Sequence, residues 1–174
     1  PIQLCLMTAQ IANGGYKITP KILTDDNELT SEQVKKAMLD SKINDSYEPL
    51  YDDQKNIRIV QEAMFSSTNE IMGTSYKSRI DDPKYQFAGK TGTAQVKRIS
   101  KRERELDLET FQIPYEERDH ALYVAYGPYS NPRYAVSIIV EHGGSGSLTA
   151  APMATQLFKL IIDRHQYRKK LPDF

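Results

Sequence analysis

Apolar residues recur at helical spacing in three parts of the chain, which we predict to be helices: residues 1–13, residues 54–72 and a stretch that starts near Pro152. The residues at their ends fit, because Pro1 suits a first turn while Gly14, Gly15 and Gly73 suit helix ends. Thr149 is the expected N-terminal cap of the last helix. The side chains expected to face the core are Ile2, Cys5 or Leu6, Ala9 and Ala12 in the first helix, Ile57, Val60, Met64 and Ile71 in the second, and Met153, Leu157, Leu160 and Ile161 in the third.

Three other stretches carry the β-branched and aromatic residues typical of strands or match their spacing: residues 88–96, 120–126 and 134–141. A loop of hairpin length, residues 127–132, joins the last two, so we expect an antiparallel meander in chain order. Because residues 134–141 are apolar on both faces, we expect this strand to occupy a central position covered on both sides. Residues 16–23 indicate a short extended piece or an edge strand around Pro20.

Two polar regions separate these elements. Residues 24–53 are rich in turn formers, and Thr30 with Gln33 predicts a capping box for a short helix that runs through Leu39. Residues 97–119 are dense in charges of both signs, which favours a solvent-exposed excursion with a weak helix. Together the helices and strands predict an α+β fold, in which helices flank a three-stranded antiparallel meander.

Composition excludes some classes of function. The chain has 174 residues, enough for one domain with a core, and its 23 basic and 23 acidic residues balance. This balance argues against a nucleic-acid or membrane-surface binder, and the acids interleaved in residues 97–119 argue against a local basic patch. Cys5 is the single cysteine and no apolar run could span a bilayer. The chain opens inside a helical pattern without a starting methionine, so we expect a piece of a longer protein.

The chemistry concentrates in residues 88–96 (AGKTGTAQV). Glycine weakens a strand, so Gly92 suggests that a ligand or another backbone comes close. Alternation along the strand puts Lys90 and Gly92 on one face and the hydroxyls of Thr91 and Thr93 on the other. A ligand along the open edge would then meet hydroxyls, a bare glycine, backbone N–H groups and an ammonium that suits an anion. The alternative is an ordinary strand with a lysine on its solvent-exposed face, which would account for the same sequence without any function.

Four segments in order resemble the C-terminal half of a penicillin-binding protein transpeptidase domain, and among these the class B, elongation-type enzymes: residues 1–4 with 12–15, residues 88–96, residues 119–122 and residues 140–147 (VEHGGSGS). The resemblance implies a β-lactamase/transpeptidase-like fold in which the three strands are part of a larger five-stranded sheet. It also implies that residues 1–174 are the C-terminal part of a single transpeptidase domain.

Two of the three motifs of this family have no match in the chain. No serine is followed three places later by lysine, and Thr74 with Lys77 has the spacing on a polar turn only. Residues 67–69 (Ser-Thr-Asn) have the form of a second serine motif, but they lie just ahead of the strand, where the family has no active-site element, so we interpret them as chance. The resemblance therefore implies that the nucleophile lies upstream and that the isolated chain is inactive.

The resemblance implies acyl transfer from a peptidoglycan stem peptide that ends in D-Ala-D-Ala, with β-lactam antibiotics as mimics of the acyl donor. Lys90 would hold positive charge near the terminal carboxylate and help proton transfer, and the Thr91 and Thr93 hydroxyls would bond that carboxylate. Gly92 would permit close approach, and the Thr93 N–H would form half of an oxyanion hole. No cofactor is expected, and the spacing of the three histidines predicts no metal site.

Other expectations and alternatives complete this reading. The parent protein would lie in the bacterial inner membrane, facing the periplasm, with a membrane glycosyltransferase partner and no nucleic acid. The outer edge of residues 134–141 could drive self-association of the fragment. A serine β-lactamase shares the fold and the Lys-Thr-Gly, and a non-catalytic scaffold could keep the fold without the serine. The glycines of residues 143–147 could also indicate a nucleotide-binding loop, although no P-loop lysine follows.

Overall fold

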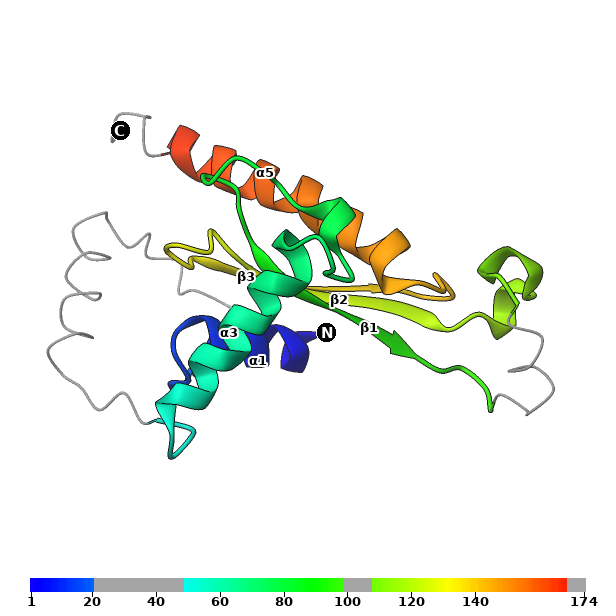
Figure 1. Cartoon of the computed structure of the whole chain (residues 1–174), viewed down its shortest axis with the longest axis horizontal. Helices are drawn as coiled ribbons and strands as arrows, with labels where there is room; N and C mark the ends of the chain where they lie inside the picture. The colour runs from blue at the N-terminus through cyan, green and yellow to red at the C-terminus, as the bar shows by residue number, and fades with distance from the viewer. Residues whose placement is uncertain (21–48, 99–107, 169–174) are drawn as a thin grey trace, which may run out of the picture.

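A three-stranded antiparallel sheet forms the centre of the protein, with helices on both of its faces (Figure 1). The computed structural model describes residues 1–20, 49–98 and 108–168. The principal elements are α1 (Ile2–Ala12), α3 (Gln54–Asn69), β1 (Ala88–Ala94), β2 (His120–Gly127), β3 (Tyr134–Val140) and α5 (Ala151–Arg168). None of the helices in these ranges is long and apolar enough to cross a membrane.

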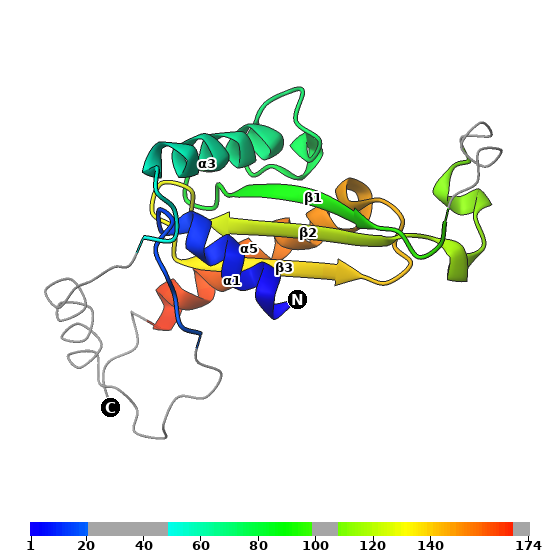
Figure 2. The same cartoon turned by 90° about the horizontal axis from the view of Figure 1, so that it is seen from below.

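The strands pair in chain order, β1-β2-β3, as the predicted meander requires. Ala88 pairs with Tyr126 at one end of the β1–β2 ladder and Ala94 with His120 at the other. Seen from below, α1 lies over one face of the sheet, α5 lies behind the other, and α3 runs along the outer side of β1 (Figure 2). The α+β prediction is confirmed, but β2 rather than residues 134–141 takes the central position among the described strands.

The hydrophobic core is divided into two clusters, one on each face of the sheet. The face towards α5 holds the larger core, in which Phe87 stacks on Phe158 at 4.9 Å between ring centroids and meets Tyr123 edge-on. The opposite face holds a smaller cluster around Met64 and Tyr126. Residues of β2 alternate between the two, so this strand supplies side chains to both cores.

The predicted stripe of α3 is partly wrong. Ile57 and Met64 are buried, but Val60 is 40% exposed and Ile71 lies beyond the end of the helix with 76% of its surface exposed. The inward face instead includes polar residues, because Gln61 donates through Nε2 to the carbonyl of Ile11 at 2.6 Å. Hydrogen bonding allows such residues to be buried, which a search for apolar spacing does not detect.

The predicted stripe of α5 is also displaced. Met153 and Leu160 are exposed, at 47% and 68%, whereas Phe158 is fully buried. The buried face consists of Ala151, Ala154, Phe158 and Ile162, with Leu157 and Ile161 beside it. A π-helical turn, Gly146–Ala150, precedes α5 and begins after Ser145, whose side chain accepts from the Leu148 N–H. Ser145, not Thr149, is therefore the cap, because the Thr149 hydroxyl donates to the Gly143 carbonyl at 2.8 Å.

The remaining sequence predictions have mixed outcomes. Helix α1 is confirmed, and Gly14 and Gly15 follow it with φ of +94° and +89°. Within residues 16–20, Tyr16 forms only an isolated bridge to Pro49, so the described part of the predicted extended piece is no strand. The helix expected from Thr30 to Leu39 lies outside the described residues, as do residues 99–107 of the charged excursion. The described residues 108–119 contain two short 3₁₀ turns and no α-helix, and for residues 99–107 the weak helix stays a prediction.

Gly146 packs directly on the sheet backbone. A Cβ on this residue would lie 2.6 Å from the Leu122 carbonyl oxygen and 2.7 Å from the Gly92 carbonyl oxygen. We expect Gly146→Ala to lower the free energy of unfolding by about 1–3 kcal/mol, because neither backbone can move aside without disturbing the β1–β2 ladder. Urea unfolding of purified protein measures this. Leu148→Ala, at a position 71% exposed, is the matched control and should change stability by less than about 0.5 kcal/mol.

Candidate functional site

The candidate site is the outer edge of β1, which has one side paired to β2 and the other facing away from the sheet. Within residues 1–20, 49–98 and 108–168, no further strand pairs with it. Thr68 of α3 shows which backbone groups point outward, because its Oγ1 accepts from the Gly89 N–H at 3.0 Å and lies 3.4 Å from the Gly89 carbonyl oxygen. The N–H and C=O of Gly89 therefore face α3 and not β2.

This observation fixes the rest of the edge, since backbone groups in an antiparallel pair alternate with a period of two. Thr91 and Thr93 lie two and four residues beyond Gly89, so their N–H and C=O groups also face away from β2. Lys90 and Gly92 use theirs in the ladder with β2, opposite Val124 and Leu122. The strand thus directs two consecutive sets of backbone donors and acceptors, at Thr91 and Thr93, away from the sheet, where no strand of the described residues pairs with them.

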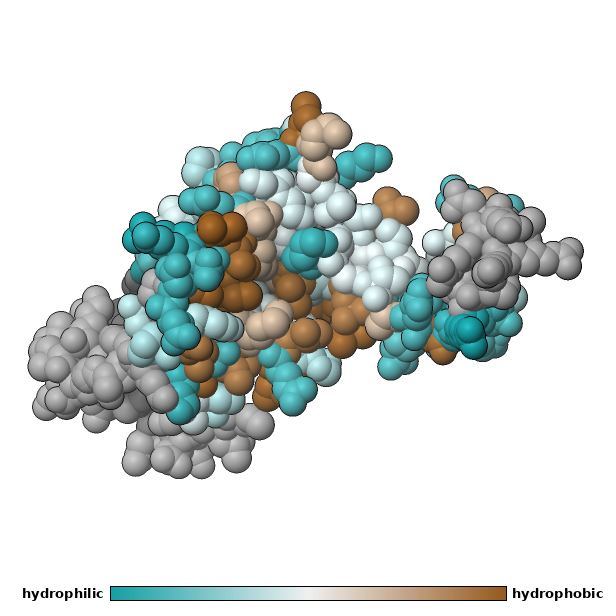
Figure 3. Space-filling model, turned by 60° about the horizontal axis from the view of Figure 1, so that its bottom comes forward, coloured by the Kyte–Doolittle hydropathy of each residue, from teal (hydrophilic) through white to brown (hydrophobic). Residues whose placement is uncertain are grey.

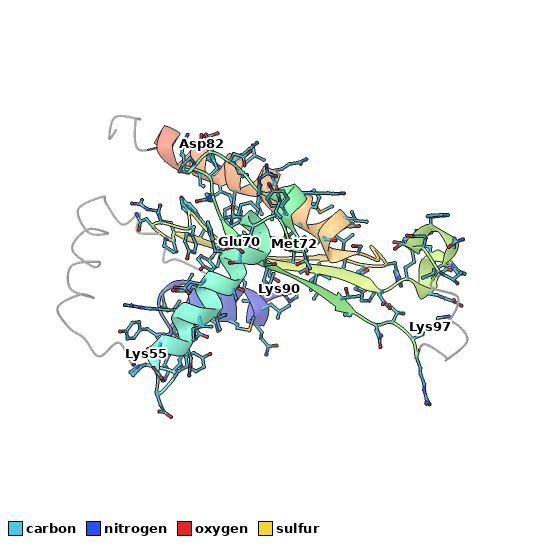
Figure 4. All side chains as sticks on the ribbon, in the orientation of Figure 1. Lys55, Glu70, Met72, Asp82, Lys90 and Lys97 are labelled. Atoms are coloured by element: carbon cyan, nitrogen blue, oxygen red, sulfur yellow. The ribbon has the colours of Figure 1, made fainter. Side chains whose placement is uncertain are left out.

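Lys90 stands at the middle of this edge. Figure 4 shows it on the side of the sheet away from α5, near the C-terminal part of α3, whereas Lys97 lies beyond the far end of the strand. The Lys90 ammonium donates to the carbonyl oxygen and to Oγ1 of Thr91, both at 3.1 Å. The side chain is exposed, and among the described residues no carboxylate forms an ion pair with it. It is thus placed to meet an incoming anion.

Gly92 leaves one sheet face bare beside Lys90. A Cβ there would approach only Leu122 Cβ, at 3.3 Å, and would point towards the face that carries Lys90. From the other face Gly146 comes so close that its own Cβ would touch the Gly92 backbone. The backbone at Gly92 is therefore packed against Gly146 on one face of the sheet and open on the face that carries Lys90.

The C-terminal part of α3 closes the first half of the same edge. Besides Thr68, Asn69 donates through Nδ2 to the Phe87 carbonyl at 2.9 Å and to the Phe65 carbonyl at 3.0 Å. Residues 67–69, which we interpreted as a chance match to a serine motif, thus have a structural role that the sequence interpretation missed. A polar Thr-Asn pair at the end of a helix that precedes an edge strand was the available signal.

Two histidines meet at the other end of the sheet. The His142 N–H donates to His120 Nδ1 at 2.9 Å, and the two rings lie 4.9 Å apart. His142 has a φ of +54° and begins the glycine-rich turn into α5. Both histidines lie at strand ends, as expected, and the described residues include no group of three potential metal ligands.

The glycine-rich turn uses its backbone N–H groups within the chain. Gly143 donates to the Val140 carbonyl, Gly144 to the Asp119 carbonyl at 2.8 Å, and Ser145 to the Gly143 carbonyl. A phosphate cradle needs such groups directed at a ligand. The turn therefore serves to connect β3 with α5 and gives the nucleotide-binding alternative no support.

Comparison with known proteins identifies relatives of this arrangement. A family model described as "Penicillin binding protein transpeptidase domain" matches residues 1–161. The peptidoglycan D,D-transpeptidase MrdA of Salmonella typhimurium is 30% identical over 94% of this chain, and that of Acinetobacter baumannii is 35% identical over 88%. The chain spans about a quarter of the length of these relatives, 25% and 21%.

Solved structures similar to this chain come from proteins of the same kind. Pseudomonas aeruginosa PBP2, in complex with WCK 5153, has a TM-score of 0.62 and 30% identity over 92% of this chain and 30% of that chain. A complex between PBP2 and MreC from Helicobacter pylori has a TM-score of 0.57 and 26% identity over 95% of this chain and 24% of that chain. These neighbours have the β-lactamase-like fold of penicillin-binding protein transpeptidase domains, as the sequence predicted.

Proposed function

The chain belongs to the penicillin-binding protein transpeptidase family, and on that premise we propose that it is the C-terminal part of the transpeptidase domain of a peptidoglycan D,D-transpeptidase, its parent protein. One observation carries the proposal: the edge of β1 presents the Thr91 and Thr93 backbone groups beside the exposed Lys90 ammonium. An extended peptide can add to such an edge as a further strand. The relatives named MrdA support the class of reaction.

The proposed reaction transfers an acyl group between stem peptides. A serine of the parent attacks the carbonyl of the penultimate D-alanine, the C–N bond to the last D-alanine breaks, and that D-alanine leaves with a proton. An amine of a second stem peptide then attacks the ester, forms the new amide and returns a proton to the serine. A β-lactam would acylate the same serine by opening its ring.

Each residue of β1 from Lys90 to Thr93 would have its own role in the reaction. Lys90 would hold its charge near the terminal carboxylate and help move the proton, and the hydroxyls of Thr91 and Thr93 would bond the carboxylate. The Thr93 N–H, on the outward edge, would stabilise the negative oxygen of the tetrahedral intermediate. Gly92 would leave the adjoining face clear for the ligand. No step needs a cofactor or metal.

Partners and location follow from the same family. We propose that the parent works at the bacterial cell envelope, where peptidoglycan is made, and binds β-lactams there. The PBP2 of Helicobacter pylori is found in complex with MreC, which supports a protein partner of that kind for the parent. The membrane glycosyltransferase and the inner-membrane anchor expected from the sequence remain predictions.

Fluorescent penicillin tests the proposal. The parent protein should form a covalent adduct that survives denaturation, and the chain of residues 1–174 alone should form none, since its sequence has no Ser-x-x-Lys. Intact-mass spectrometry measures both. An adduct on the isolated chain would contradict the missing nucleophile, and an unlabelled, folded parent would indicate a non-catalytic scaffold. Rapid hydrolysis of the adduct would indicate a β-lactamase.

A further inference from the structure

A chain of buried hydroxyls runs beneath the first residues of β1. Tyr123 of β2 places its phenol oxygen 3.0 Å from Thr68 Oγ1 and 3.0 Å from Ser75 Oγ. Thr68 and Tyr123 are fully buried and Ser75 is 1% exposed. The three side chains come from α3, from β2 and from the turn that follows α3, so they join three separate elements.

The direction of each hydrogen bond follows from the two ends of this chain. Gly89 N–H donates to Thr68 Oγ1, and Ser75 Oγ donates to the Ser67 carbonyl at 3.0 Å. With the Ser75 proton on the Ser67 carbonyl, Ser75 Oγ accepts from Tyr123 at 3.0 Å, and the shortest contact open to the Thr68 proton is the Tyr123 phenol oxygen at 3.0 Å, ahead of the Met64 and Gly89 carbonyls at 3.4 Å. This arrangement uses every proton of the hydroxyl chain and links the β1 backbone at Gly89 to the end of α3.

The phenol at the centre remains protonated. Burial raises the pKa of Tyr123 above its ordinary value, against the opposing effect of the bonds with Ser75 and Thr68. Burial disfavours the charged form of a phenol, so the Tyr123 hydroxyl keeps its proton at neutral pH and can donate it. Its hydrogen-bond role is thus constant.

The absence of a side chain at Gly89 makes room for the Tyr123 phenol. A Cβ on Gly89 would lie within contact distance of the Tyr123 phenol oxygen and ring, so any side chain there would displace the phenol. Gly89 is bonded outward to Thr68 and is followed at once by Lys90. The backbone at Gly89 is therefore in direct contact with the hydroxyl chain, and Thr91 and Thr93 follow it by two and four residues on the same edge.

We propose that Tyr123, Thr68 and Ser75 are positioning residues for acyl transfer, which hold the β1 backbone so that Lys90 and the Thr93 N–H meet the reacting peptide. This inference rests on the proposed function. Only Thr68 contacts the outer edge, at Gly89, and the three buried side chains do not extend to the part of the edge at Thr91 and Thr93. They act through Gly89, and their loss should slow the chemical step more than it weakens the first, non-covalent binding of ligand.

Tyr123→Phe in the parent protein tests the proposal. The variant leaves Thr68 and Ser75 without their shared partner, so we expect the rate constant for penicillin acylation to fall about tenfold to a hundredfold. The dissociation constant of the non-covalent complex should change less than about threefold. Stopped-flow kinetics, at a temperature where the variant is fully folded, separates the two. Amide hydrogen exchange at Gly89 and Lys90 should become at least about tenfold faster.

Tyr126→Phe is the matched control. Tyr126 lies on the same strand but faces the opposite cluster, and its buried hydroxyl has no hydrogen-bond partner among the described residues. Its removal should alter neither acylation nor exchange at Gly89. Thr68→Val and Thr68→Ser form a second pair, because valine removes the hydroxyl while serine keeps it and should restore the acylation rate.

The outcomes are distinguishable. If Tyr123→Phe acylates at the wild-type rate per folded molecule, or if exchange at Gly89 is unchanged, the inference is wrong. If Tyr123→Phe and Tyr126→Phe slow acylation equally, the effect is one of general packing and the inference is also wrong. A folded wild-type parent that is not acylated overturns the proposed function, and the exchange rates then still decide whether the hydroxyl chain holds the edge.

Discussion

Gly92→Val in the parent protein is expected to abolish covalent labelling by fluorescent penicillin while leaving the protein folded. The valine side chain would stand on the sheet face beside Lys90, in the space that an incoming ligand needs. Its Cβ would meet only Leu122 Cβ at 3.3 Å, and Leu122 is half-buried and can shift by a few tenths of an ångström. Gel labelling measures the adduct, and thermal unfolding checks the fold.

Ala94→Val provides the control for added bulk. Ala94 lies on the same face of β1 two residues further along, opposite His120 and at the end of the strand. Labelling of this variant should stay close to that of wild type. Normal labelling of Gly92→Val would instead mean that the ligand does not approach β1 at Gly92, and the proposed binding mode would have to be abandoned.

Thr93→Pro is expected to slow acylation about a hundredfold to a thousandfold, the usual effect of removing one donor from an oxyanion hole. Proline lacks both the backbone N–H that faces outward at Thr93 and the hydroxyl proposed to bond the carboxylate, and an edge strand tolerates proline where no ladder bond is lost. The fold should therefore survive while the reaction suffers. Acylation rate constants compared at equal folded fraction measure the effect.

Ala94→Pro separates this effect from damage to the sheet. The N–H of Ala94 faces β2, one residue out of phase with Thr93, so proline there removes a ladder bond. This variant should lose stability, with acylation per folded molecule falling less than in Thr93→Pro. The reverse ranking of the two variants would show that the Thr93 N–H has no special part in the reaction.

The strands could be predicted from the sequence because their signals are local. The β-branched and aromatic residues of β2 and β3 and the loop between them determine an antiparallel hairpin, and only the central position was misassigned. That error arose because residues 134–141 look apolar on both faces, whereas the sheet position depends on what pairs beside them. Pairing is a long-range property that hydrophobicity along one segment does not encode.

The inward faces of the helices could be predicted only in part. Two sets of residues in α5 have helical spacing, the expected stripe with its leucines and a second set with Ala151, Ala154 and Phe158. The second set packs on the sheet. In α3 the inward residues include Thr68 and Asn69, whose partners are the Gly89 N–H in β1 and the Phe87 carbonyl just before it, about twenty positions later in the chain. Neither choice can be made without knowing the surface that each helix meets.

The candidate site could also be predicted only in part. Lys90, Thr91, Gly92 and Thr93 were recognisable as a motif, and their roles in the reaction remain proposals. Which backbone groups face outward follows from a single contact, between Thr68 and Gly89, that no pattern in the sequence specifies. The hydroxyl chain centred on Tyr123 was equally hidden, since a tyrosine in a strand of apolar residues predicts only a core side chain.

Exposed apolar residues gather over the face that carries α1, as Figure 3 shows in brown. Helix α1 has no charged residue, and Ile2 and Met7 on it are 56% and 40% exposed. Self-association was predicted for the outer edge of residues 134–141 and stays a prediction, and this apolar surface over α1 is a second candidate contact, so size-exclusion chromatography of the fragment tests both.

The half-covered edge of β1 limits how another chain can use it. The end of α3 occupies the backbone groups of Phe87 and Gly89, and the strand ends at Ala94, so within β1 itself a second strand could pair only at Thr91 and Thr93. Runaway growth of an intermolecular sheet needs a longer template. The described edge is therefore long enough to pair with the terminal dipeptide of the proposed function and shorter than the template that fibril growth needs.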